Sequence, residues 1–224
     1  ERIRESIRIN QRAFEVVKAR LTGNQTERQI AHDLESQIRS FGGSRCAFDP
    51  IVGVGPRSAL PHGVPSCTQI GEAGFVFIDW GAQVDGYASD LTRVLVTAKI
   101  PPKIRKIYEI VLKAQLAAIA KIRPGVSFKA VDAVARRIIA DAGFEKNFGH
   151  GLGHGFGLEI HERPFISPIG EGVFQPRMVV TVEPGIYLSG IGGVRIEDDV
   201  LVTKDGNEVL SSLPKSFDEC VVEI

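Results

Sequence analysis

The sequence predicts an α+β fold in which one helix–helix–hairpin unit occurs twice. Amphipathic helical patterns alternate with short apolar strands, and the same order of elements returns after Pro101-Pro102. The two halves also close on similar strands, Val94-Leu95-Val96-Thr97 and Val200-Leu201-Val202-Thr203. A recurring order of elements is typical of a duplicated unit with a pseudo-two-fold axis. We therefore expect a single domain over residues 1–224, with pseudo-repeats at about 1–100 and 101–224.

The first half begins with two helices and ends in a hairpin. Apolar residues recur at helical spacing over residues 3–20. Thr26 and Gln29 have the spacing of a capping box, which begins a second helix that continues to Gly42-Gly43. The apolar run 75–78 is typical of a buried strand, and Asp85-Gly86 is a hairpin signal before a strand at 91–96.

The second half repeats this order. We expect two helices, then a strand, a glycine-rich turn and a closing strand, at 102–122, 127–142, 179–182, 190–193 and 200–203. Pro124-Gly125 separates the two helices, and Gly143 ends the second one. Strands from both halves would form one curved antiparallel sheet, with helices on one face and a cleft on the other.

Composition and charge exclude several classes of protein. Hydrophobic residues make up 43% and charged residues 24%, which is typical of a globular chain and not of a disordered one. Lys plus Arg and Asp plus Glu both number 27, so net charge favours neither nucleic acid nor a membrane surface. No apolar run is long enough to span a bilayer.

Cysteine usage and the ends of the sequence give two further expectations. Cys46, Cys67 and Cys220 are odd in number and scattered, which predicts a reducing, cytoplasmic compartment without disulfides or a thiolate zinc site. No secretion leader is recognisable. Because the chain starts at Glu1 and its single methionine is Met178, we expect the natural chain to extend upstream.

Each half places two acids on its predicted hairpin, namely Asp79 and Asp90, then Glu183 and Glu197. Residues equidistant from a turn face each other across an antiparallel hairpin. The midpoint of 79 and 90 lies just before the predicted first turn, and the midpoint of 183 and 197 is Gly190. We therefore expect each pair to meet across its hairpin, and the pseudo-symmetry to bring both pairs together.

Four carboxylates beside apolar strands repel one another and are costly to desolvate. Two divalent cations would neutralise this charge. Oxygen-rich ligation suits manganese, with cobalt, zinc or iron as alternatives. A single acid in a hairpin is usually a solvated edge residue, but four acids placed symmetrically on the most apolar strands favour a metal site.

The histidines strengthen the prediction of a metal site. His150, His154 and His161 lie in one segment among five glycines, and glycine lets backbone and metal approach closely. A phosphate-binding loop is the alternative, but neither GxxxxGK[ST] nor GxGxxG occurs. His32, within the second helix, is expected to be structural or exposed. No cysteine lies in a setting that suggests Cys–His nucleophilic catalysis.

These motifs resemble the pita-bread metallopeptidases, a family that includes methionine aminopeptidases, aminopeptidase P and prolidase (Xaa-Pro dipeptidase). The segment from His150 to Pro164 resembles the family pattern HGxGHGxGLxxHExP, and the segment around Arg195 resembles GxRxEDxxLVT. The resemblance covers essentially the whole chain and implies the pita-bread fold. The five metal ligands of the family are matched, in order, by Asp79, Asp90, His154, Glu183 and Glu197.

The resemblance also implies a role for each ligand. Asp79 would bind one ion and His154 with Glu183 the other, while Asp90 and Glu197 would bridge the two. The ions would lower the pKa of a water enough to supply hydroxide near neutral pH. Glu183 would then transfer a proton to the leaving nitrogen.

Five further residues match positions that contact substrate in the family. His62 and His161 would contact substrate and stabilise the tetrahedral intermediate, with His161 at the oxyanion. His150, Arg195 and Tyr187 would lie beside the metals and the substrate. Arg195 could pair either with a substrate carboxylate or with a nearby acid such as Asp85.

The implied activity is that of a two-metal exopeptidase that cleaves proline-containing di-, tri- or oligopeptides at a bond involving proline. The short gap between Glu183 and Glu197 and the Glu162-Arg163-Pro164 ending favour this branch. Methionine aminopeptidase is the alternative within enzymes. An interaction module without hydrolysis is the alternative outside enzymes, and retention of all five ligands argues against it. A homodimer is also expected, although the N-terminal domain usual in proline-specific members has no counterpart in residues 1–224.

Overall fold

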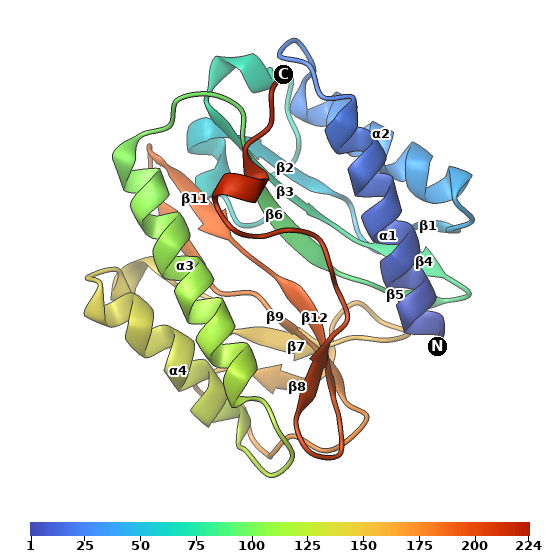
Figure 1. Ribbon diagram of the computed structural model, residues 1–224, viewed down its shortest axis with the longest axis vertical. Coiled ribbons are helices and arrows are strands. Elements are labelled where there is room, and N and C mark those ends of the chain that lie inside the picture. Colours follow the sequence, from blue (N-terminus) through green and yellow to red (C-terminus); the bar gives the residue numbers. More distant parts are fainter.

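Four α-helices and thirteen short strands make up the computed structural model, which describes residues 1–224 (Figure 1). The helices are α1 (Arg2–Ala19), α2 (Glu27–Ser40), α3 (Pro102–Lys121) and α4 (Phe128–Asp141). The strands of the first half are β1 (Arg45–Cys46), β2 (Ile51–Val54), β3 (Phe75–Trp80), β4 (Ala82–Val84), β5 (Tyr87–Ala88) and β6 (Leu91–Val96). Those of the second half are β7 (Gly153–Gly155), β8 (Glu162–Ile166), β9 (Val179–Val182), β10 (Gly185–Leu188), β11 (Gly192–Arg195), β12 (Asp198–Val202) and β13 (Asn207–Val209).

The helix boundaries follow the signals in the sequence. The Thr26 hydroxyl accepts a hydrogen bond from the Gln29 N–H at 3.2 Å, and the Gln29 side chain accepts from the Thr26 N–H at 2.9 Å. This confirms the predicted capping box at the start of α2. In the same way, Ser127 caps α4, and Gly143 follows α4 with a φ of 85°, a left-handed conformation that glycine adopts readily.

Each half contains one long antiparallel hairpin that is interrupted beside the predicted acids. In the first half, the pairing of β3 with β6 continues in the same register into β4 and β5, and the turn is Asp85-Gly86, as predicted. In the second half, the pairing of β9 with β12 continues into β10 and β11. The first hairpin breaks at Gly81, where a Cβ atom would collide with the carbonyl oxygen of Ser89.

These breaks divide the predicted curved layer into four antiparallel hydrogen-bonded groups. Their strand orders are β1-β4-β5, β2-β3-β6, β10-β11 and β13-β12-β9-β7-β8. The two halves meet where the Glu197 N–H donates to the Thr92 carbonyl oxygen at 3.3 Å. The two halves are therefore joined beside β6, although the strands do not form one continuous hydrogen-bonded sheet.

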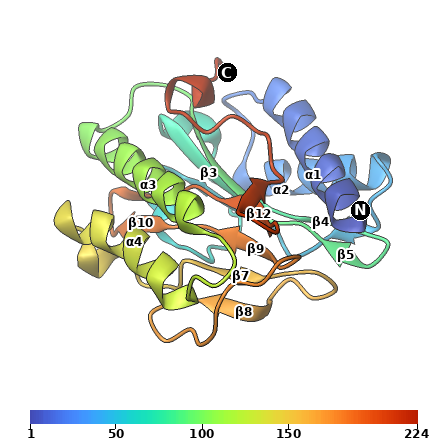
Figure 2. The ribbon, with the colours of Figure 1, turned by 60° about the horizontal axis from the view of Figure 1, so that its bottom comes forward.

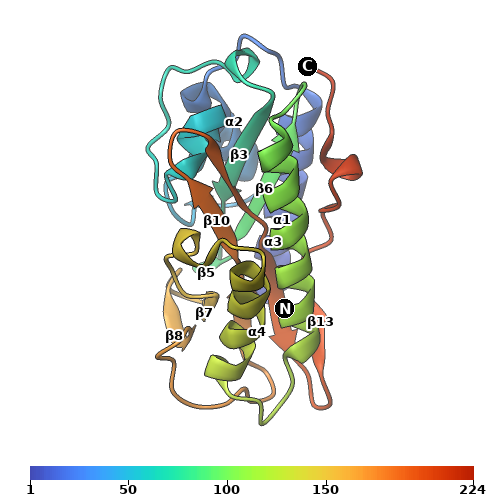
Figure 3. The same ribbon diagram turned by 90° about the vertical axis from the view of Figure 1, so that its left-hand side faces the viewer.

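The helices cover the strands as one pair for each half (Figures 1 and 2). α1 packs against α2 and β4, and α3 packs against α4 and β11. Figure 3 shows α3 along one side of the strands, with β8 and β10 toward the opposite side. No helix of this fold combines the length and the apolar character needed to traverse a bilayer.

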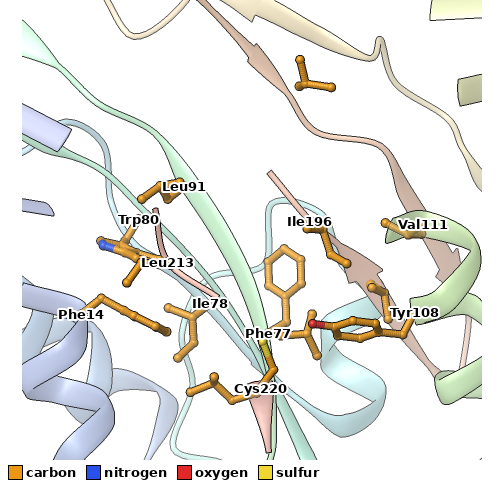
Figure 4. Close-up of a cluster of buried hydrophobic side chains, with 14 of the residues drawn as sticks. Phe14, Phe77, Ile78, Trp80, Leu91, Tyr108, Val111, Ile196, Leu213 and Cys220 are labelled. Carbon is orange, nitrogen blue, oxygen red and sulfur yellow. The ribbon is translucent and has the colours of Figure 1, made fainter. Parts of the chain in front are cut away.

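One cluster of 49 buried hydrophobic residues draws on both halves of the chain. Figure 4 shows Phe14 beside Trp80, whose rings stack at 4.2 Å between centroids, together with Tyr108 and Ile196 from the second half. The Trp80 indole N–H also donates to the Asn10 carbonyl oxygen at 3.2 Å. Full burial of a large apolar side chain contributes about 1.5–3 kcal/mol. This shared core gives the broken hairpins a rigid base.

Candidate metal centre

A cavity of about 1170 Å³ lies over the interrupted hairpins, and all five predicted metal ligands line it. Asp79 belongs to β3 and His154 to β7. The other three, Asp90, Glu183 and Glu197, occupy the hairpin breaks next to β6, β9 and β12. Because breaks in both halves face the same cavity, acids that are distant in sequence converge there.

Three buried carboxylates form the first group of this cluster. Asp79, Asp90 and Glu197 each offer one oxygen, and these oxygens all lie within 4.8 Å of one another. The Oδ1 atom of Asp79 is buried and has no hydrogen-bond partner. A buried acceptor without a donor is costly unless something else satisfies it, and a cation would do so.

His154 and Glu183 form the second group. His154 Nε2 lies 3.2 Å from Glu183 Oε1 and 3.6 Å from Asp90 Oδ2. Asp90 therefore contacts both groups, which is the position that a bridging carboxylate needs.

The protonation equilibria reflect this crowding. Burial, followed by the charges of neighbouring carboxylates, raises the pKa of Asp90 and of Glu197 well above the ordinary value. Burial also acts to raise the pKa of Glu183. The hydrogen bond and the charge of His154 outweigh this effect and lower the pKa of Glu183 to about 2. Burial lowers the pKa of His154, and the same partnership with Glu183 outweighs it and raises that pKa.

The prediction that Asp79 and Asp90 lie directly opposite each other is wrong by two positions. The residue opposite Asp79 is Thr92, and the same register places Asp90 opposite Gly81. The hairpin centre falls between Asp85 and Gly86 and not before them. Asp90 is thus a diagonal neighbour on the same face as Asp79, which still brings the two carboxylates together. In the second half, the register on both sides of the break agrees with the predicted midpoint at Gly190.

Two threonines that the sequence patterns do not single out form hydrogen bonds with predicted ligands. The Thr92 hydroxyl donates to Glu197 Oε2 at 2.6 Å and accepts from Arg195 Nε at 3.1 Å. The Thr181 hydroxyl donates to Glu183 Oε1 at 3.0 Å and accepts from the His154 N–H at 3.1 Å. The available signal was their spacing, because each threonine lies two residues from a predicted ligand and therefore on the same face of its strand.

Asp199 is a third missed residue. It is fully buried, and its Oδ2 accepts a hydrogen bond of 3.4 Å from the Asp90 N–H. Its other oxygen has no partner. It lies two residues beyond Glu197, at the spacing that would have identified it.

Arg195 pairs with an acid of the cluster. Its guanidinium forms a buried ion pair with Asp79, lies 3.9 Å from Glu183 and stacks over the Phe77 ring at 4.7 Å. Asp85, the acid suggested from the sequence, is therefore not the partner. It occupies the exposed hairpin turn with a φ of 49°, whereas Asp79 lies on the buried strand beneath Arg195.

Tyr187 lies behind the cavity and does not line it. Its hydroxyl is 3.0 Å from His150 Nε2 and accepts a hydrogen bond of 2.8 Å from Arg195. Burial raises the pKa of Tyr187 to about 12. The structure therefore gives this residue contacts with two predicted site residues and no place in the cavity wall.

The three remaining predicted site histidines line the cavity. The ring of His161 lies 4.4 Å from the ring of His154, and His62 occupies the loop before β3. Burial lowers the pKa of His150, and burial followed by the charge of His154 lowers that of His161. His32 is exposed on α2, as expected, and does not line the cavity.

The sequence matches a family of metallopeptidases, in agreement with this cluster of acids and histidines. Residues 1–204 match the model of metallopeptidase family M24. The chain belongs to this family.

Relatives of known name agree with the assignment to M24. The Xaa-Pro dipeptidase of Pyrococcus horikoshii is 44% identical over 215 residues, which are 96% of this chain and 61% of that protein. The X-Pro aminopeptidase of Thermotoga maritima superposes with a TM-score of 0.94 at 41% identity, over 100% of this chain and 62% of that one. The prolidase of Pyrococcus furiosus superposes with a TM-score of 0.92 at 44% identity, and the match covers 95% of this chain and 63% of that one.

These likenesses confirm the predicted α+β pita-bread fold of M24 proteins. The alternatives of methionine aminopeptidase and of an interaction module are not favoured by them. The chain spans about three fifths of the length of the relatives named above.

M24 membership implies divalent metal ions, and the residues of the cluster fit them. The donors are carboxylate oxygens and one imidazole, a set that suits hard or borderline divalent cations. Cations would also satisfy the partnerless Asp79 oxygen and offset the burial and the neighbouring negative charges that raise the pKa of Asp90 and of Glu197.

Proposed function

We propose that this protein is a metal-dependent exopeptidase that hydrolyses peptides at a bond involving proline, in the manner of an Xaa-Pro dipeptidase or an Xaa-Pro aminopeptidase. The observation that carries the proposal is the convergence of the five predicted metal ligands on one large cavity in an M24 fold. The names of the three relatives reported above support the preference for proline.

Two divalent ions, with manganese as the expected metal, are proposed to occupy the cluster. Asp79 would hold one ion, and His154 and Glu183 would hold the other. Asp90 and Glu197 would each bind both ions. When bound, the ions supply Lewis-acid stabilisation of negative charge and an activated water. The contact of Asp90 with both groups of ligands supports its proposed bridging role.

The catalytic roles fall to residues of this chain. Glu183 would accept a proton and pass it to the leaving nitrogen. His161, next to His154, would donate to the oxyanion, and His62 would contact the substrate from the facing loop. His150 and Arg195 also line the cavity, and Tyr187 would hold these two in place through its hydroxyl.

Proline imposes particular demands on such a site. A bond to proline is a tertiary amide without an N–H, so the ring needs an apolar surface and the leaving nitrogen needs a proton donor. Apolar side chains of the cavity wall include Phe48, Ile51 and Phe128. Peptides with proline after the first residue should therefore show a higher kcat/KM than their alanine counterparts.

Three further expectations stay predictions. They are a single domain over residues 1–224 with pseudo-repeats divided near residue 100, a homodimer, and a cytoplasmic location. Sedimentation equilibrium tests the homodimer directly.

A panel of peptides tests the proposed function. A proline dipeptide, a proline-containing tripeptide, their alanine counterparts and a Met-Gly peptide are incubated with the protein, with and without added manganese. We expect hydrolysis of proline peptides in the presence of metal, and the tripeptide distinguishes aminopeptidase from dipeptidase action. Equal kcat/KM for matched proline and alanine peptides removes the proline preference. Preferential cleavage of the Met-Gly peptide favours methionine aminopeptidase instead.

A further inference from the structure

The loop that carries His62 forms a wall of the cavity, and side chains near its tip are solvent-exposed. This loop, residues 55–66, is called the His62 loop below. Five consecutive residues of it, 61–65, line the cavity. His62 itself is exposed, and Val64 is 80% exposed. Since the loop tip has little packing of its own, its position depends on its anchors.

One buried carboxylate holds both ends of the His62 loop. Glu27, the first residue of α2, has a fully buried side chain. It accepts hydrogen bonds from the Val54 N–H at 2.8 Å and from Arg57 Nε at 2.9 Å, where the loop begins. Where the loop ends, it accepts from the Ser66 N–H at 2.8 Å and from the Ser66 hydroxyl at 2.7 Å. Four donors match the acceptor capacity of an ionised carboxylate.

Arg57 extends this anchor toward the tip of the loop. While its Nε binds Glu27, its NH2 group donates to the Val64 carbonyl oxygen at 2.8 Å. Val64 is two residues from His62. The chain of contacts therefore runs from α2 through Arg57 into the cavity wall.

The other side of the His62 loop contacts β11. The Gly193 N–H of β11 donates to the Ser58 hydroxyl at 2.7 Å, and Arg195 lies 3.4 Å from the Pro61 carbonyl oxygen. The loop therefore lies between Glu27 of α2 and strand β11, and it forms hydrogen bonds with both. A shift of the anchor would move His62 relative to the metal ligands.

The second half of the chain uses the same device. On α4, the buried Asp132 pairs with Arg136, which donates to the carbonyl oxygens of Phe148 at 3.0 Å and of His150 at 2.9 Å. Each half thus has a helix-borne acid whose arginine partner holds a histidine-bearing segment of the cavity wall. This recurrence indicates a common function in positioning the histidines.

We propose that Glu27, acting through Arg57 and Ser66, is a positioning residue that holds His62 at the substrate. The proposal rests on the proposed function for its effect on hydrolysis, and its effect on the loop is independent of that function. Glu27→Gln replaces a carboxylate oxygen by an amide NH2, which would face a donor from Ser66 or Arg57. One end of the loop then loses its acceptor.

A double-mutant cycle tests whether Glu27 acts through His62. Glu27→Gln should lower kcat/KM for a proline peptide by about 10–100-fold, the scale of a small misplacement of a substrate-contacting group. Glu35→Gln, on the same helix in an exposed pair with Arg39, should leave kcat/KM unchanged. In a His62→Ala background, Glu27→Gln should cause no further loss. An equal loss in both backgrounds overturns the proposal.

Hydrogen exchange gives a readout that does not depend on hydrolysis. In Glu27→Gln, the Val54 or the Ser66 amide, whichever faces the new NH2 group, should exchange faster, while amides of β9 and β12 keep their protection. Unchanged exchange at both amides overturns the proposal even if activity falls. If wild-type protein fails to cleave proline peptides, the proposed function fails and the exchange result still decides the anchoring role. Ser66→Ala removes a single donor and carries the same two tests if Glu27→Gln does not fold.

Discussion

The hydroxyl of Thr92 donates a 2.6 Å hydrogen bond to Glu197, a residue 105 positions further along the chain. The same hydroxyl accepts from Arg195, so its proton and one of its two lone pairs are engaged. The orientation of Glu197 in one half of the molecule therefore depends on a threonine in the other half.

Thr92→Val keeps the shape of this side chain and removes the hydrogen bond to Glu197. We expect metal affinity to fall by about 10–100-fold, the usual effect of losing an outer partner of a ligand, while the fold is retained. Competitive metal titration measures the change. Thr97→Val is the matched control, because the Thr97 hydroxyl bonds only the Ala73 carbonyl oxygen at 3.3 Å, away from the cluster. Equal affinity in both variants would show that Thr92 does not orient Glu197.

Asp90→Asn tests the proposed bridging carboxylate. Because Asp90 contacts both groups of ligands, the substitution should lower the bound metal below two equivalents and reduce activity with it. Elemental analysis of the purified variant measures the metal. Two full equivalents in this variant contradict the bridging assignment.

Glu183→Gln separates catalysis from folding. The amide keeps the size of the side chain but does not accept the proton, so turnover should fall by several powers of ten, roughly the combined scale of lost acid–base and ligand roles. The melting temperature should show that the fold survives. Glu171→Gln, an exposed acid at the cavity wall, is the control and should keep full turnover. Near-native turnover of metal-loaded Glu183→Gln excludes Glu183 as the proton carrier.

His150 predicts a pH dependence of stability. Burial lowers the pKa of His150 in the folded state below its ordinary value near 6.5, and bound cations would lower it further. As the pH falls below about 6.5, the unfolded chain therefore binds more protons than the folded one, and stability is lost. His150→Gln should lose less free energy of unfolding between pH 7.5 and 5.5 than wild type does. Urea unfolding at both pH values measures this, and equal losses in the two proteins contradict the prediction.

Local patterns predicted the four helices, the strands β3, β6, β9 and β12, and the four acids that converge on the cavity. The ligand role of His154 follows from the family resemblance. The capping box at Thr26 and the hairpin turn at Asp85-Gly86 depend on neighbours within three or four residues, so sequence spacing alone predicts them. The midpoint rule predicted Gly190 correctly but misjudged Asp90 by two positions. That rule locates a turn only to within a residue or two, and a diagonal neighbour on the same face satisfies it nearly as well.

Contacts between distant segments were beyond the sequence patterns. The pairing of Arg195 with Asp79, and not with Asp85, depends on how the two hairpins pack together. In the sequence, Glu27 is only the residue after the helix cap Thr26, although its side chain anchors a loop some 30 residues away. Tyr187 lies behind the cavity wall because its strand turns that face toward His150 and Arg195. None of these relations has a local period that would reveal it.

Turnover measured against bound metal tests the central claim most directly. Protein stripped of metal by a chelator is titrated with manganese, and hydrolysis of one proline peptide is followed at each step together with the bound metal. We predict no turnover without metal and a rise that continues until about two equivalents are bound, the number expected of a bridged pair of ions. Full turnover of the stripped protein, or saturation of binding well below one equivalent, would contradict the account.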